Sequence, residues 1–137
     1  MESIIRPDRT VSAVLRFTIP GAPVPCARAR VFADERTGKI RAARPGRTAS
    51  YEQHVATCAR LAANLARWAS VEAEYGVKLS VFRAERKGDW DNFAKACDDG
   101  MNGIVFPDDR MVASAVVHVA LDRQHPRVEV VVERWAQ

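Results

Sequence analysis

Apolar and polar residues alternate along several stretches of the chain, the pattern of strands that bury one face. The clearest stretch covers residues 74–84, where Val77, Leu79 and Val81 fall on one side. The strands that this pattern predicts cover residues 13–19, 74–84, 112–121 and 127–133, with shorter ones at 30–33 and 39–42. Prolines and glycines separate them, as is typical of turns between strands.

Two other stretches repeat apolar residues every three or four positions, which predicts helices. The first covers residues 50–69, and its expected buried stripe is Tyr51, Val55, Cys58, Ala62, Leu65 and Ala69. The second begins at Asp91 or Asn92 and would bury Phe93, Cys97 and Met101. Gly103 suits the C-terminal cap of this second helix.

These elements predict one α+β (mixed α/β) domain over residues 13–137, with a single sheet of about four or five strands packed with two helices. Residues 1–12 are expected to form a flexible leader. No apolar run approaches the roughly 20 residues that a membrane helix needs, so we expect no membrane partner and a cytoplasmic location.

Charge is distributed unevenly over the chain, whose net charge is +4. Residues 28–47 contain seven basic and two acidic residues (7 − 2 = +5), and residues 89–109 contain one lysine and six aspartates (1 − 6 = −5). The basic residues expected to grip a polyanion such as DNA are Arg28, Arg30, Arg41, Arg44 and Arg47. The three cysteines, Cys26, Cys58 and Cys97, have no zinc-ligand spacing.

The acidic region contains a D-x-D motif, Asp89 and Asp91, where a strand ends and a helix begins. In extended backbone, residues i and i+2 point to the same side, so both carboxylates could face one cation. Oxygen ligands of this kind suit Mg²⁺ or Mn²⁺. Taken alone, however, the motif equally fits a solvated turn in which Asp91 is a plain N-cap.

Lys95 lies one helical turn after Asp91 and adds a second element to this region. It fits either a surface ion pair or a cation directed at a phosphate. Asp108 and Asp109 follow in a proline-containing turn, where paired aspartates are usually solvated.

Residues 87–112 resemble the signature of RusA-type Holliday-junction endonucleases, D-x-D-N-L-x-K-x-x-x-D-x-L followed by an apolar link and D-D. The residues that fall on this pattern are Asp89, Asp91, Asn92, Lys95, Asp99, Asp108 and Asp109. The stretch I-P-G-A-P-V-P-C-A-R-A-R and the later R-T-x-x-Y-E extend the resemblance to about residues 15–133. Cys26 stands where the family often has lysine, and Phe93 replaces the usual leucine. The paired acids Asp98 and Asp99 replace a more apolar pair, which leaves the role of Asp98 open.

The resemblance implies an endodeoxyribonuclease that resolves four-way junctions and other branched DNA by paired symmetric nicks. It assigns Asp89, Asp91 and Asp109, rather than Asp108, as ligands of Mg²⁺, with Mn²⁺ as a substitute and no organic cofactor. Lys95 becomes the catalytic or phosphate-contacting cation. It also implies a homodimer, because two symmetric nicks need two symmetric sites; Trp68 or Trp135 would belong to the interface or, more commonly for tryptophan, to the core.

Two rival interpretations remain from the residues themselves. The chain could bind branched DNA without cutting it, which the intact set of acids and Lys95 argues against. It could instead be another phosphotransfer enzyme with a D-x-D motif, but Asn92 and Phe93 do not fit the phosphatase pattern.

Overall fold

Four strands form one mixed sheet with the order β1-β6-β4-β5. The strands are β1 (Val11–Pro20), β4 (Glu74–Arg83), β5 (Val112–Leu121) and β6 (Arg127–Trp135). β6 is antiparallel to both of its neighbours, whereas β5 runs parallel to β4. The parallel pair requires a crossover, and the helix that supplies it carries most of the acidic residues described below.

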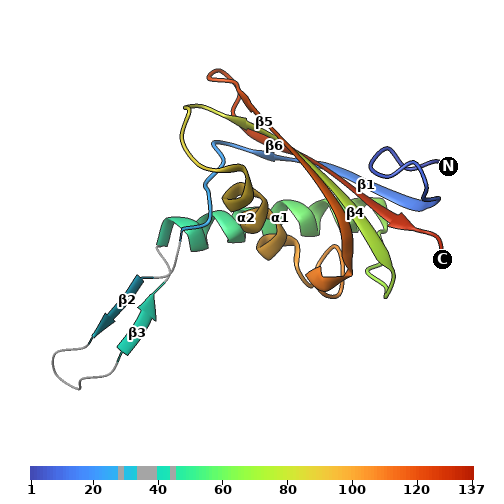
Figure 1. Ribbon diagram of the computed structural model, residues 1–137, viewed down its shortest axis with the longest axis horizontal. Helices are drawn as coiled ribbons and strands as arrows, with labels where there is room; N and C mark the ends of the chain where they lie inside the picture. The colour runs from blue at the N-terminus through green and yellow to red at the C-terminus, as the bar shows by residue number, and fades with distance from the viewer. Residues whose placement is uncertain (28–29, 34–39, 44–45) are drawn as a thin grey trace.

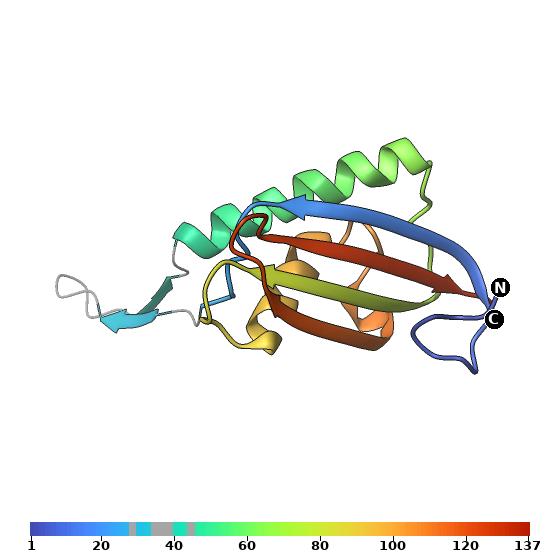
Figure 2. The same ribbon diagram turned by 90° about the horizontal axis from the view of Figure 1, so that it is seen from above.

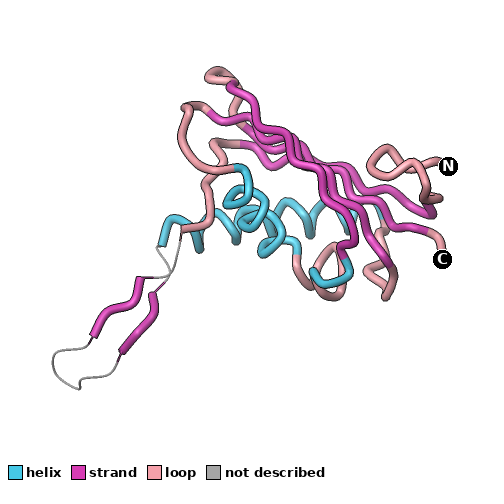
Figure 3. The backbone as a smooth tube through the Cα atoms, viewed as in Figure 1, coloured by secondary structure: helices cyan, strands magenta, loops and turns pink. Residues whose placement is uncertain are grey.

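The structure is a computed structural model that describes residues 1–27, 30–33, 40–43 and 46–137, the second and third of these ranges by their backbone alone. Helices α1 (Gly46–Ala66) and α2 (Trp90–Met101) lie on the same face of the sheet, as Figures 1 and 2 show. β2 (Arg30–Ala33) and β3 (Ile40–Ala43) pair in a separate antiparallel hairpin, visible apart from the sheet in Figure 3. The predicted α+β class, single main sheet and two helices are confirmed.

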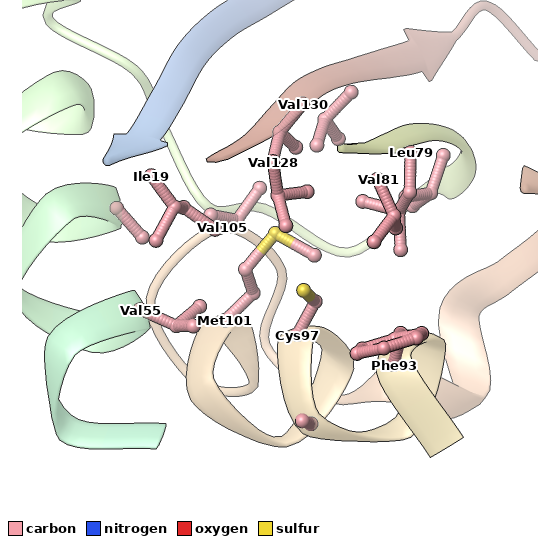
Figure 4. Close-up of a cluster of buried hydrophobic side chains, with 14 of the residues drawn as sticks. Ile19, Val55, Leu79, Val81, Phe93, Cys97, Met101, Val105, Val128 and Val130 are labelled. Atoms are coloured by element: carbon pink, nitrogen blue, oxygen red, sulfur yellow. The ribbon is translucent and has the colours of Figure 1, made fainter. Parts of the chain in front are cut away.

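The core lies between the sheet and the two helices. The predicted inward residues Val77, Leu79 and Val81 are buried, as are those of β6. Figure 4 shows Cys97 and Met101 pointing from α2 toward Val128. The apolar stripe of α2 therefore fixes which of its faces is left for solvent.

The buried stripe of α1 differs from the predicted one. From Tyr51 onward the buried residues recur every fourth position, at Tyr51, Val55, Ala59 and Ala63, and the buried Thr48 precedes Tyr51 by three. Leu65 was expected inside but is 79% exposed, and α1 ends at Ala66, before Ala69. Four residues turn a helix by more than a full turn, so a stripe of this spacing drifts around the helix and leaves Leu65 outside.

Two glycines set the position of α2. A Cβ on Gly100 would lie 2.6 Å from the Cβ of Val55, so this glycine allows α2 to approach α1 closely. Gly88 has a φ of +92°, a conformation that favours glycine, and it turns the chain into Asp89 at the start of α2.

Residues 1–10, part of the expected leader, contact the sheet. The buried Ser3 hydroxyl donates a hydrogen bond to the carboxylate of Glu133, and the Ile4 amide donates another (3.0 Å). Arg9 lies over the ring of Trp135, which is buried. None of the helices in the described part of the chain has the length and apolar character needed to cross a bilayer.

Candidate active site

A cleft of about 580 Å³ runs along α2 beside β5. Its charged lining residues are Asp91, Lys95, Asp98, Asp99 and Asp109, and its uncharged ones are Trp90, Ala94, Ala115 and Val117. The cleft thus holds four carboxylates and one amine. This donor set is oxygen-rich, which matches the ligand preference of Mg²⁺.

The charged residues of α2 share one face because of their spacing. Lys95 follows Asp91 by four positions, about one helical turn, and Asp98 and Asp99 follow it by seven and eight, about two turns. Phe93 and Cys97 occupy the opposite, buried face. Asp91 and Asp98 are separated by a rise of about 10 Å along the axis, and Lys95 lies between them.

Asp89 is the N-cap of α2, in extended conformation with an exposed side chain. Its carbonyl oxygen accepts hydrogen bonds from the amides of Asn92 (3.1 Å) and Phe93 (3.2 Å). Asp91 is already inside the helix, and its carboxylate accepts from the Asn92 amide (3.0 Å). The expected geometry of two carboxylates on one extended strand is therefore absent here, because the helix begins between them.

The structure distinguishes Asp108 from Asp109. Asp108 is the N-cap of the short 3-10 helix η1 (Asp109–Met111), and its carboxylate accepts a hydrogen bond from the Arg110 amide (3.0 Å). This bond is the main reason that the pKa of Asp108 is lowered. Asp109 lines the cleft, and its amide donates to Oδ1 of Asn102, the C-cap of α2 (3.1 Å).

Asp98 is a partly buried carboxylate that lines the cleft. Its pKa is raised to about 6, chiefly by burial and also by the nearby charges of Asp109 and Asp99, against an opposing effect of Lys95. The sequence alone assigned no role to Asp98. Its spacing of seven residues from Asp91 was the signal that could have placed it on the same face.

Lys95 forms an ion pair with Asp99, with 3.3 Å between Nζ and the carboxylate. The lysine side chain is 59% exposed, so this pair contributes little to stability. Lys95 lines the cleft, and its amine, beside Asp99, is not held by a strong buried interaction.

A second group, Cys26, Glu52 and Asp99, brings ligand-type atoms within 4.8 Å of one another and shares Asp99 with the cleft. In the described part of the chain, Asp89, Asp91 and Asp109 form no grouping this tight. The Cys26 group includes a thiol, which is a poor ligand for Mg²⁺, and all three of its residues make other interactions. The oxygen-only cleft is the better candidate for a magnesium site.

The predicted DNA-contacting arginines are described only in part. Arg28 and Arg44 lie outside the described residues, and Arg30 and Arg41 are placed on β2 and β3 by their backbone alone. Arg47 is exposed near the start of α1.

Two basic residues that the sequence did not single out lie beside Arg47. Arg83 and Lys87 line the same surface pocket as Arg47, next to the α2 N-terminus. Nη1 of Arg83 also donates to the carbonyl of Gly88 (2.9 Å), and so helps to hold the turn that leads into Asp89. Arg83 is on β4 and Lys87 is in the loop after it, far from Arg47 in the sequence, so the sequence alone does not show that these three charges lie together.

Neither predicted interface tryptophan is exposed. Trp135 is buried, and the half-buried Trp68 donates from Nε1 to the Val105 carbonyl (2.8 Å). Both therefore belong to the packing of the domain rather than to an open surface.

Comparison with known proteins identifies a family for this chain. The family model described as endodeoxyribonuclease RusA matches residues 20–133, which include both helices, the 3-10 helix and every residue of the cleft. A search of the curated proteins found no match. Because the family model covers most of the 137 residues, the chain belongs to the RusA family of endodeoxyribonucleases.

Proposed function

We propose that this protein is a Mg²⁺-dependent endonuclease that cuts four-way junctions and related branched DNA by paired symmetric nicks. The observation that carries the proposal is the cleft along α2, which Asp91, Asp98, Asp109 and Lys95 line in a chain of an endodeoxyribonuclease family. A cleft lined by both carboxylates and an amine suits a cation and a phosphate together.

The carboxylates are proposed to hold the metal. The proposed ligands are Asp91 and Asp109, which line the cleft, and Asp89, which precedes them at the N-cap of α2 and is not among the lining residues; Asp98 adds negative charge beside Asp109. When bound, the ion would polarise a non-bridging phosphate oxygen and lower the pKa of a coordinated water. Without a cation, four carboxylates in one cleft repel one another; burial is the main cause of the raised pKa of Asp98, and repulsion from Asp109 and Asp99 adds to it.

The reaction is the hydrolysis of one phosphodiester bond. A bond forms between the water oxygen and phosphorus, and the bond between phosphorus and one bridging deoxyribose oxygen breaks. The water loses a proton and the departing oxygen gains one. Lys95 would offset negative charge that builds on the phosphate; the exposure of its side chain at the cleft and its weak pair with Asp99 support this role.

Basic residues are proposed to hold the DNA backbone. Arg47, Arg83 and Lys87 lie beside the start of α2, and Arg28, Arg30, Arg41 and Arg44 are candidates from the sequence. Such contacts do not depend on base sequence, so affinity should fall steeply as salt is raised. A homodimer would supply the two symmetric sites that paired nicks require.

The test is an assay with a labelled four-way junction and a linear duplex of the same sequence, each with Mg²⁺ and with EDTA. We expect Mg²⁺-dependent nicks on opposite strands of the junction and no cutting of the duplex. Asp91→Asn should abolish cutting but preserve junction binding. Tight binding by the unaltered protein without any nicks would favour an inactive junction-binding protein instead, and equal cutting of the duplex would exclude structure specificity.

A further inference from the structure

Trp90 is an exposed aromatic residue next to the proposed catalytic aspartates. Its side chain is 62% exposed, and within the described residues no other large aromatic side chain is exposed to this degree. The other two tryptophans are packed and use their Nε1 atoms in hydrogen bonds to Val105 and Glu133. An indole left in water forgoes the gain of burying a large apolar surface, so its exposure calls for an explanation.

The position of Trp90 follows from the start of α2. It is the first residue of the helix, directly between Asp89 and Asp91, and it lines the cleft together with Lys95. The uncharged residues that share the cleft include Ala94, one turn further along α2, and Ala115 on β5. These side chains are too small to cover an indole, so a flat apolar surface is open beside the carboxylates.

We infer that Trp90 is a stacking platform for an unpaired base at the branch point of the DNA, an inference that rests on the proposed function. Every nucleotide phosphate carries a base one sugar away, so a phosphate held at Asp91 and Lys95 brings its own or the next base close to the indole. A base inside a duplex is already stacked on its neighbours and is not available. A base at a branch point can leave its stack, and aromatic side chains bind such bases regardless of sequence.

The surroundings of Trp90 favour a base over a protein surface. Charged residues are depleted at the centre of protein–protein interfaces, where exposed tryptophans otherwise gather. Trp90 has Asp89 and Asp91 as chain neighbours and shares its cleft with Lys95 and Asp109. A nucleotide suits this mixture, because it presents a flat apolar base beside a charged phosphate.

The experiment uses the full chain carrying Asp91→Asn, so that junction DNA is bound but not cut. The junction contains 2-aminopurine, a fluorescent adenine analogue, either at the branch point or in the middle of one arm. We expect binding to change the fluorescence strongly at the branch point and little in the arm. Adding Trp90→Ala should remove the branch-point change and weaken junction binding roughly 5- to 150-fold, whereas Trp90→Phe should keep most of both.

Leu65→Ala is the matched control, because Leu65 is even more exposed and lies on α1, outside the cleft. It should leave fluorescence and affinity unchanged. If the Trp90→Ala protein binds as tightly as its parent with the same fluorescence change, the inference fails. Light scattering tests whether Trp90 contacts a second copy of the chain instead of a base. If Trp90→Ala changes the protein from dimer to monomer, the ring belongs to the dimer interface and the inference is wrong.

The proposed function is checked separately with the unaltered protein. If that protein cuts junctions but Trp90→Ala has no effect on the fluorescence, only the stacking role is wrong. If it neither binds nor cuts branched DNA, the proposed function is wrong and the stacking role is excluded with it.

Discussion

The amide of Asp109 donates a hydrogen bond to Oδ1 of Asn102 across 3.1 Å, which ties the start of η1 to the end of α2. Asp109 comes seven residues after Asn102, at the end of an apolar link. This contact therefore joins two elements of the cleft that the chain itself connects only through a loop. It makes Asn102 a positioning residue for the proposed metal ligand Asp109.

Replacing Asn102 with alanine should weaken metal binding more than it weakens the fold. The bond is exposed, so its loss should lower the free energy of unfolding by about 1 kcal/mol or less. Because Asp109 would no longer be held in place, calorimetric titration with Mn²⁺ should show a several-fold lower affinity. Asn64→Ala, on the exposed surface of α1, is the control. Unchanged Mn²⁺ affinity in Asn102→Ala would remove the positioning role.

Replacing Asp98 with asparagine should stabilise the metal-free protein at neutral pH. The folded-state pKa of Asp98 is about 6, above its ordinary value of 3.8. The folded protein therefore binds more protons than the unfolded chain between about pH 4 and 6, and stability from this group is lost as the pH rises through that window. We expect Asp98→Asn in EDTA to be more stable by roughly 1 to 3 kcal/mol at pH 7.5.

The same comparison has an internal control at low pH. At pH 4 Asp98 is protonated in the folded protein, so the two proteins should unfold at nearly the same denaturant concentration. A difference that persists unchanged from pH 7.5 to pH 4 would show that charge at Asp98 is not its cause.

Lys95→Ala should separate catalysis from stability. Its pair with Asp99 is exposed and contributes at most about 1 kcal/mol, so the melting temperature should hardly change. Loss of a group that stabilises charge on the reacting phosphate should slow cutting by at least about 100-fold. Arg123→Ala removes an exposed cation from the β5–β6 turn and should cut at the unaltered rate. If both variants cut at the same rate, Lys95 has no catalytic role and forms only a surface ion pair.

Gly100→Ala tests the close approach of the helices. The added Cβ would lie 2.6 Å from the Cβ of Val55 and 2.9 Å from the carbonyl of Glu52, so the two helices must move apart. We expect a loss of about 1 to 3 kcal/mol in thermal or denaturant unfolding. Gly46→Ala, where the added Cβ meets nothing within 4 Å, should cost much less. The packing account would be contradicted by similar costs at both positions.

The sequence predicted the main elements because periodic burial determines them. Val77, Leu79 and Val81 alternate because one face of β4 is covered, and the stripe of α2 follows from its packing on that face. The error on α1 has the same origin. α1 is rich in alanine, so several of its faces could form the buried stripe. Only contact with the sheet and α2 decides that Ala59 is buried while Leu65 is exposed.

The site was harder to predict because it depends on contacts between distant segments. The sequence favoured Asp109 over Asp108 only through a family resemblance, whereas the structure gives each a distinct environment. The proximity of Asp98 to Asp109 depends on how the loop after α2 folds back. α2 starts at Trp90, one or two residues earlier than the predicted Asp91 or Asn92, which changes the relation of Asp89 to Asp91; Trp90 is exposed at this start.

The most direct test of the central claim compares Asp109→Asn with Asp108→Asn in one assay of Mg²⁺-dependent nicking of a four-way junction. The two residues are adjacent in sequence, but only Asp109 lines the cleft, while Asp108 caps η1, a role that asparagine retains. We predict that Asp109→Asn loses nicking while still binding the junction, and that Asp108→Asn cuts at close to the unaltered rate. Nicking by Asp109→Asn at the unaltered rate would contradict the assignment of this cleft as the catalytic site.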